Sequence, residues 1–415
     1  MDTARGPAVG SLSLYFLDSA IIGAGVGNPF EEETGEAGRA LDPARNPFRP
    51  GMGRVPPDFG GREPQLRRAK VVVDQLVHGH TPEFVLYRGV RGVGKTALLA
   101  YVRDQARRRG LQTLHVEADR EDGRLDATLQ TLLRGLSDLL AAAGAEVVAR
   151  LTTVSTTAQG PRLRSQGGPA ATLEAMVDDV ARLAEATGNG VLLTVDEVHE
   201  GGDLLLKPLL RSAHRVAQDG QPLGVLLSGL PTAAESLFDE GQTYTERLAR
   251  VDLGLLERDG TAEAIRRPFA RDAGLGVDEL VVDTVHDGAG GYPWFVQLWG
   301  EALWDLATDP ARLELPVARE AGERVHLRIE DFYLSRWRRV PSGRAALLVT
   351  ALADAGGDAA IGDLLDRLEI THQAASPARR ALLDLGLCWA PGRGRLAFSV
   401  PGFADWLQRT RPELP

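Results

Sequence analysis

Short apolar runs alternate with segments of helical periodicity in the first half of the chain. The runs are too short for helices and continuously apolar, as expected of strands buried on both faces of a parallel sheet; they occupy residues 83–88, 111–117, 191–195 and 223–228. Apolar residues at helical spacing occupy residues 62–78, 96–109, 127–143 and 171–187. This alternation predicts a doubly wound α/β domain with a parallel sheet, whose ligand site lies at the carboxyl ends of the strands.

The pattern changes on either side of this domain. Residues 1–46 are rich in glycine, alanine and acidic side chains and have little periodicity, which predicts a flexible N-terminal extension. Residues 152–168 are polar and rich in turn-forming residues, as in a surface insertion. Strands are expected to stop after Leu255, and residues 261–307 have the periodicity of helices.

A compact α+β unit is predicted from about residue 340. Its expected elements are a helix at 344–355, a strand at 359–361, helices at 362–368 and 376–385, and a β-hairpin at 386–400. Three helices followed by a hairpin predict a winged helix–turn–helix. The whole pattern divides the chain into an extension (1–46), an α/β core (47–256), a helical lid (257–325) and a winged helix (326–415).

Composition narrows the class of protein. A chain of 415 residues with 43% hydrophobic and 25% charged residues is typical of soluble globular proteins of two or three domains. No apolar run is long enough for a membrane span, and Asp18 interrupts the apolar stretch at 12–27, so no signal peptide is expected. The single cysteine, Cys388, excludes an internal disulfide framework, predicts a core residue and favours a cytoplasmic location. A net charge of −10 argues against attraction of nucleic acid by the whole surface.

Residues 89–96 have the spacing G-x-x-x-x-G-K-[ST] of a phosphate-binding P-loop. Lys95 is one of only three lysines beside 44 arginines, and a tight loop around phosphates needs a compact ammonium rather than a planar guanidinium. The glycines let backbone N–H groups turn inward, and the Thr96 hydroxyl is placed to bind Mg²⁺. We therefore predict that ATP and Mg²⁺ bind at Gly89, Val90, Arg91, Gly92, Val93, Gly94, Lys95, Thr96 and Ala97.

Two acids end the apolar strand predicted at 191–195. Asp196 is expected to hold the Mg²⁺ ion, and Glu197 to polarise the attacking water as the general base. Acids in this position can also simply mark a loop, but an upstream P-loop favours the catalytic interpretation. His199 is expected either at the rim of the site or in it.

Two more side chains complete the predicted catalytic set with Lys95 and Glu197. Ser228 ends the next strand, where a polar group can lie between the acids and the γ-phosphate, although it is also an ordinary strand-end serine. Arg247 is expected to reach the γ-phosphate of a neighbouring subunit, with Arg250 as the second choice. The alternative for Arg247 is an ordinary salt bridge on the surface of a helix.

These motifs, in kind and order, resemble the AAA+ superfamily, in particular its branch near the STAND and initiator-type ATPases. The resemblance covers residues 46–310 and includes Gly291-Tyr-Pro293, which is similar to the lid motif whose proline contacts the adenine side; it thus implies a role for Pro293. Gly60-Gly-Arg-Glu63 resembles the motif that flanks the adenine. The chain departs from many members of the family by having no arginine at the start of the helix after Pro293, which favours slow hydrolysis by a switch.

The C-terminal unit is the expected partner-binding part. Residues 336–415 contain eleven arginines and eight acids, whereas the whole chain is acidic. Such a local reversal permits contacts with duplex DNA, for which the third helix and the wing offer His372, Gln373, Ser376, Arg379, Arg380, Arg393 and Arg395. Winged helices also dock on proteins or clamp their own chain.

Three functional hypotheses follow from this sequence. The first is an ATPase switch that remodels or assembles with protein or DNA partners, including further copies of itself. The second is an ATP-licensed DNA-binding protein with little turnover, and the third is a nucleotide-locked oligomeric scaffold. None of them requires a membrane.

Overall fold

The computed structural model describes residues 41–51, 53–118, 125–157, 160–164, 168–231, 248–308 and 312–413. The extension predicted over residues 1–46 therefore lies almost wholly outside the described residues. No helix within the described ranges is both long enough and apolar enough to cross a membrane.

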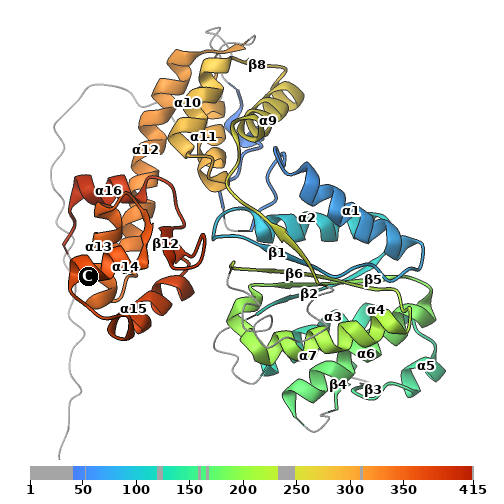
Figure 1. Ribbon diagram of the computed structural model, residues 1–415. Coiled ribbons are helices and arrows are strands. Elements are labelled where there is room, and N and C mark those ends of the chain that lie inside the picture. The colour runs from blue at the N-terminus through green and yellow to red at the C-terminus, as the bar shows by residue number, and fades with distance from the viewer. Residues whose placement is uncertain are drawn as a thin grey trace, which may run out of the picture. The chain divides into compact units, whose positions relative to one another are not determined.

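A five-stranded parallel sheet organises the N-terminal half (Figure 1). Its strands, in spatial order, are β2 (Gln112–Glu117), β5 (Val191–Asp196), β6 (Leu223–Gly229), β1 (Val85–Arg88) and β7 (Ala249–Asp252). Each neighbouring pair is parallel, so all five strands end at the same edge. The order places β6 between β1 and β5, and thus the three predicted sequence motifs at adjacent strand ends.

Helices cover both faces of the sheet, as the doubly wound pattern predicts. One face carries α1 (Glu63–Val77) and α2 (Lys95–Arg108), and the other carries α3 (Asp126–Gly135), α6 (Pro169–Thr187) and α7 (Val198–Gln218) (Figure 1). Side chains of β5 alternate between the two cores: Val191, Leu193 and Val195 pack on one side, and Leu192 on the other. Burial on both faces explains why the strands are continuously apolar.

The core differs from the sequence-based expectation in three places. The helix predicted over 127–143 is two helices, α3 and α4 (Ser137–Ala142), which meet at Leu136. The polar insertion at 152–168 contains an antiparallel hairpin of β3 (Val154–Thr157) and β4 (Gly160–Leu163), preceded by the short helix α5 (Ala145–Ala149). Strand β7 was not predicted, because this edge strand alternates half-buried and exposed residues and has no apolar run.

The region after the core is mainly helical. It comprises α9 (Arg258–Pro268), the π-helical turn η2 (Phe269–Ala273), α10 (Glu279–Ala289), α11 (Pro293–Leu306) and α12 (Leu315–Trp337). The expectation that strands stop after Leu255 was wrong, since the short strands β8 (Gly276–Val277) and β9 (Arg312–Leu313) pair here in parallel. The predicted boundary between residues 325 and 326 falls inside the continuous helix α12.

The C-terminal region is an α+β unit with the predicted order of elements. It contains α13 (Arg344–Asp354), β10 (Asp358–Ala360), α14 (Ile361–Leu368), α15 (His372–Asp384), β11 (Cys388–Trp389) and β12 (Arg395–Phe398). The three strands form an antiparallel sheet with β12 in the centre. A further helix, α16 (Phe403–Thr410), was not predicted. The fold class is thus an α/β P-loop core with a helical region and a C-terminal α+β unit.

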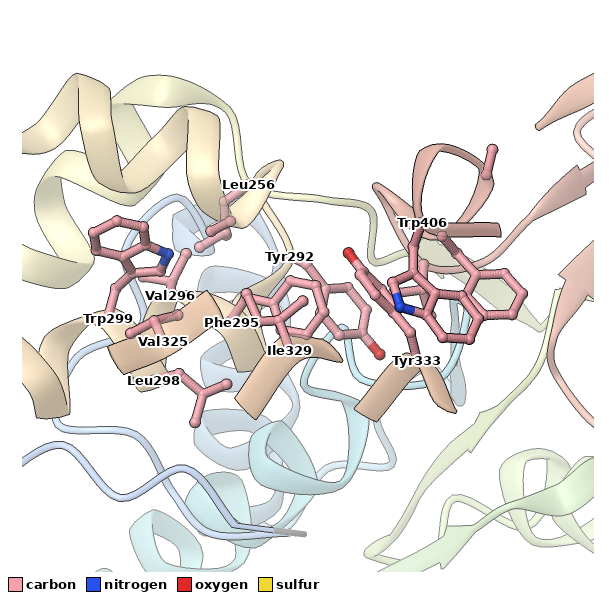
Figure 2. Packing of buried hydrophobic residues seen from close by; sticks show 14 of the residues in the cluster. Leu256, Tyr292, Phe295, Val296, Leu298, Trp299, Val325, Ile329, Tyr333 and Trp406 are labelled. Carbon is pink, nitrogen blue, oxygen red and sulfur yellow. The ribbon is translucent and has the colours of Figure 1, made fainter. Parts of the chain in front are cut away.

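One apolar cluster joins the helical region to the C-terminal unit. It contains Phe48, from the segment before α1, and buried residues from Leu256 to Leu407, including members of α9 to α16. Its aromatic members lie close together around α12, where Tyr292, Phe295, Tyr333 and Trp406 gather (Figure 2). Buried, closely packed aromatic side chains hold their neighbours in fixed positions, so this cluster fixes the position of the N-terminal end of α11.

Candidate functional site

The predicted P-loop connects β1 to α2 at the carboxyl edge of the sheet. Gly92 and Gly94 have φ angles of 84° and 95°, in the left-handed region that favours glycine. Helix α2 begins directly after Gly94, at Lys95. The backbone N–H groups of the first helical turn have no partner within the helix, and together with the helix dipole they attract an anion.

Lys95 is buried against its own loop. Its side chain is 4% exposed, and Nζ donates hydrogen bonds to the carbonyl oxygens of Gly89, at 2.9 Å, and Val90, at 3.0 Å. Burial lowers the pKa of Lys95, while the nearby carboxylates of Glu197 and Asp196 act in the opposite direction. The ammonium group is therefore held inside the loop, and the two acids lie close enough to influence its charge.

Asp196 and Glu197 follow one another at the end of β5. Asp196 is 2% exposed, and its Oδ1 accepts hydrogen bonds from the Glu197 N–H, at 2.9 Å, and from the Ser228 hydroxyl. Ser228 reaches Asp196 because β6 is the direct neighbour of β5. The structure thus brings together the two acids and the serine that the sequence analysis selected.

Glu197 has an unusual backbone conformation and electrostatic environment. Its φ angle of 49° is in the left-handed region, which a non-glycine residue adopts at an energetic cost, and it forms the N-cap of α7. Burial raises the pKa of Glu197, and Lys95 opposes this rise. A carboxyl group whose pKa is moved toward neutrality is suited to proton transfer.

His199 and Glu200 link Glu197 to the P-loop. Nδ1 of His199 lies 3.3 Å from Oε2 of Glu197, and Nε2 of the same ring lies 3.4 Å from Oε1 of Glu200. Oε1 of Glu200 also accepts from the Arg91 guanidinium at 3.2 Å. His199 therefore lies between Glu197 and Glu200 beside the P-loop, and Glu200 is a neighbour of these residues that the sequence analysis did not consider.

Two hydrogen-bond donors from outside the P-loop bind its carbonyl groups, and the sequence analysis named neither of these side chains as a site residue. The Arg62 guanidinium is 7% exposed and donates to the carbonyls of Val93, at 3.2 Å, and Gly254, at 2.5 Å. The Tyr292 hydroxyl donates to the carbonyl of Arg91 at 2.8 Å. Both residues belong to glycine-containing segments already noted, 60–63 and 291–293, and this membership was the available signal.

The remaining predicted residues have varied positions. Pro293 is the first residue of α11, next to Tyr292, and it is half-buried; Ala97 is buried in α2. Arg247 lies outside the described residues. The alternative, Arg250, lies on β7 and is exposed.

The oxygen atoms of side chains at this edge of the sheet fit a magnesium ion that is also bound by phosphates. The hydroxyl of Thr96, in the first turn of α2, and the carboxylate of Asp196 are oxygen ligands, which Mg²⁺ prefers. No group of three histidine, cysteine or acidic side chains that could hold a metal exists among the described residues. An ion here would thus depend on phosphate and water for most of its ligands, as is usual for Mg²⁺.

Helix α15, the turn between β11 and β12, and the first residue of β12 hold the predicted DNA-contacting residues. His372, Gln373, Ser376 and Arg393 are exposed. Arg380 forms an ion pair with Asp384, and Arg395 forms one with Asp358. Nε of Arg379 is buried and has no hydrogen-bond partner within the described structure. Cys388 is buried, and burial raises the pKa of its thiol, which is consistent with the predicted core residue.

Two family models match the chain. The model described as an AAA ATPase domain matches residues 58–227, which include the P-loop, Asp196 and Glu197. A domain of unknown function, DUF8462, matches residues 330–407. No curated protein matches the chain.

Solved structures that resemble the chain are distant from it in sequence. The Aeropyrum pernix ORC1 protein in complex with DNA is 17% identical, with 88% of this chain and 96% of that chain covered and a TM-score of 0.44. The Thermotoga maritima RuvB Holliday junction branch migration motor is 14% identical, with coverage of 86% and 97% and a TM-score of 0.41. Cdc6p from Pyrobaculum aerophilum is 11% identical, with coverage of 89% and 96% and a TM-score of 0.43. Similarity at this level does not define a function.

Proposed function

We propose, on the premise that residues 58–227 match the model of an AAA ATPase domain, that the protein is a Mg²⁺-dependent ATP hydrolase that acts as a nucleotide-driven switch. The observation that carries the proposal is the position of Lys95, buried in a P-loop within electrostatic reach of Asp196 and Glu197. A buried ammonium next to two carboxylates is suited to bind phosphates and a divalent cation together.

Each side chain has a separate role in the proposed reaction. The ammonium of Lys95 binds the outer phosphates, and Thr96 and Asp196 supply protein ligands for Mg²⁺. Glu197 accepts a proton from the attacking water, and its raised pKa supports this role. Ser228 holds Asp196 in place through its hydroxyl group. Bound Mg²⁺ would neutralise charge that develops on the phosphates.

We expect slow turnover. No arginine occurs at the start of α11, and the finger assigned to Arg247 requires a neighbouring subunit. We also propose that Pro293 binds near the adenine and that the protein is cytoplasmic. The core (47–256), the lid (257–325) and the winged helix (326–415) then act as three parts, with α12 shared by the last two. In this proposal the nucleotide state determines how the lid, and through it the winged helix, engages protein or DNA partners.

Measurement of nucleotide binding and phosphate release tests the proposal. The parent should bind ATP with Mg²⁺ and release phosphate over several turnovers, and Glu197→Gln should still bind but release phosphate on the order of 10²-fold more slowly. A parent that binds ATP without multiple turnover would favour the nucleotide-locked scaffold. A parent that binds no nucleotide would contradict all three hypotheses.

The alternative function, ATP-licensed binding of duplex DNA, is supported by a specific observation on α15. Its half-buried Arg379 has no ion pair among the described residues, and Arg393, on the turn between β11 and β12, is exposed. Cations of this kind can contact phosphates of the DNA backbone. Retention on duplex DNA that weakens with salt would distinguish this function from docking on a protein.

A further inference from the structure

Tyr292 forms a contact between the helical region and the P-loop that no motif or family match assigns. Its side chain is 1% exposed, and its hydroxyl donates to the carbonyl oxygen of Arg91 at 2.8 Å. The ring also lies against Gly92, since a Cβ atom built on Gly92 would be 1.9 Å from the Tyr292 hydroxyl oxygen. The Tyr292 side chain therefore fills the space next to Gly92 and leaves no room there for a side chain from the loop.

The hydrogen bond determines the direction of a peptide group. In a trans peptide the C=O and the following N–H point in opposite directions, so a carbonyl of Arg91 held toward Tyr292 turns the N–H of Gly92 away from it. Gly92 has a φ angle of 84°, which only a glycine adopts at no steric cost. P-loops bind phosphates through such inward-turned N–H groups.

The other contacts of Arg91 hold its side chain but not this peptide. Its guanidinium donates to Glu200, and its aliphatic part lies near Gly386, where a built Cβ would be 2.7 Å from Cδ of Arg91. The carbonyl groups of Gly89 and Val90 are bound by Lys95, and that of Val93 by Arg62. The Arg91 carbonyl depends on Tyr292.

We propose that Tyr292 is a positioning residue of the P-loop, whose hydroxyl turns the Gly92 N–H toward the nucleotide phosphates. This inference rests on the proposed nucleotide binding. It also gives the lid a direct influence on phosphate affinity, because Tyr292 is the N-cap of α11 and moves with that helix. Movement of α11 away from the loop would release the peptide and weaken phosphate binding.

The chain contains a matched control. Tyr333 is also buried, and its hydroxyl donates to a backbone carbonyl, that of Pro401, at 2.6 Å. It belongs to the same aromatic cluster as Tyr292 (Figure 2). Tyr333→Phe removes the same group from the same kind of bond, but its carbonyl partner lies in the C-terminal unit and not in the P-loop.

The experiment compares Tyr292→Phe and Tyr333→Phe in the full chain. Loss of one hydrogen bond corresponds to a decrease of about 5- to 10-fold in affinity. We expect this decrease in the affinity for ADP and for Mg²⁺-ATP, measured by calorimetry, in Tyr292→Phe and not in Tyr333→Phe. In turnover assays KM should rise with kcat nearly unchanged, as for lost ground-state binding. Without nucleotide, hydrogen exchange of the peptide over 89–96 should be faster in Tyr292→Phe than in the parent or in Tyr333→Phe.

Several results would overturn the inference. Parent-like affinity and exchange in Tyr292→Phe would show that the hydroxyl does not hold the loop. Equal losses in both variants, or faster exchange over α10 as well as over 89–96, would show that the lid is merely destabilised. If the parent bound no nucleotide, the proposed function would fail, whereas the exchange comparison would still decide whether Tyr292 orders the loop.

Discussion

At the scale of single residues, the charge of the Lys95 side chain and its shape are two separate requirements of the P-loop. Lys95 reaches two carbonyl groups of its own loop while only 4% of its surface is exposed. A thin aliphatic stem ending in a compact ammonium fits such a space, whereas a guanidinium is planar and wider. The scarcity of lysine elsewhere in the chain agrees with a steric requirement at this position.

Replacement of Lys95 separates the two properties. Lys95→Ala should abolish or greatly weaken ATP binding, because the phosphates lose their point cation. Lys95→Arg keeps the charge and should fail nearly as badly, since the fork does not fit the loop. Calorimetry of both variants with Mg²⁺-ATP measures this, with Lys70→Arg, an exposed lysine of α1, as the control. Parent-like binding by Lys95→Arg would contradict the steric explanation.

The raised pKa of Glu197 predicts how the rate of ATP hydrolysis depends on pH. The base works only when ionised, and burial raises its pKa above the ordinary value of 4.5, so the rate should fall at a higher pH than for an exposed glutamate. The loss should occur as the pH decreases through the raised pKa, with full activity above it. Phosphate release at saturating ATP across the pH range checks this, and Glu197→Gln should remove the acidic limb. An acidic limb near the ordinary value would argue against the assignment.

Asp196 should behave differently from Glu197. Asp196→Asn removes a charged ligand of Mg²⁺, so both the Mg²⁺ dependence and the nucleotide affinity should weaken together. Titration of ATP binding at several Mg²⁺ concentrations measures the effect, with Glu197→Gln as the comparison that keeps affinity. A variant with unchanged Mg²⁺ dependence would show that the ion is held elsewhere.

At the scale of elements, α15 is the part of the C-terminal unit that the DNA alternative needs. Arg379 and Arg380 lie next to each other on this helix, and only Arg380 has an ion pair among the described residues, with Asp384. Exposed ion pairs of this type are weak, so Arg380 can exchange its partner for a phosphate.

Replacement of both arginines on α15 by alanine tests the DNA alternative. Affinity for duplex DNA should fall, and the slope of log affinity against log salt should shrink by about two contacts. ATP affinity should stay unchanged, because it depends on the P-loop. The double variant Arg319→Ala and Arg324→Ala, on the exposed surface of α12, is the control. No DNA retention by the parent near 50 mM salt, with or without ATP, would favour docking on a protein.

At the scale of the whole molecule, contacts between distant segments surround the proposed nucleotide site. Arg62 joins the segment before α1 to the P-loop and to Gly254, and Tyr292 joins α11 to the loop. Burial lowers the pKa of Arg62 to about 10, so its guanidinium remains charged at neutral pH. A ligand that binds this folded arrangement and not the unfolded chain stabilises it.

Nucleotide should therefore raise thermal stability. ATP with Mg²⁺ at 100 times its Kd should contribute about 2.7 kcal/mol to the free energy of unfolding, and the melting temperature should rise by several degrees. Lys95→Ala should show no such shift, which excludes an effect of solvent conditions. Mass photometry of the same samples tests assembly, since Arg247 can serve only a neighbouring subunit in this proposal. A rise of equal size in Lys95→Ala would place the nucleotide elsewhere.

The sequence by itself determined the features that depend on local backbone and short periodicity. The P-loop was recognisable because glycine at 92 and 94 meets a positive-φ requirement that few other residues can meet. Strands β5 and β6 were recognisable because burial on both faces leaves a continuous apolar run. The pair Asp196–Glu197 followed from the same strand.

The tertiary structure alone decided which distant side chains complete the site. Tyr292 and Arg91 are separated by 201 positions, and Arg62 and Gly254 by 192, so no local pattern marks these hydrogen bonds. Strand β7 was also hidden, because an edge strand pairs on one side only and keeps alternating polarity. Such contacts arise when separate cores pack together, and packing selects partners by shape and burial rather than by their spacing along the chain.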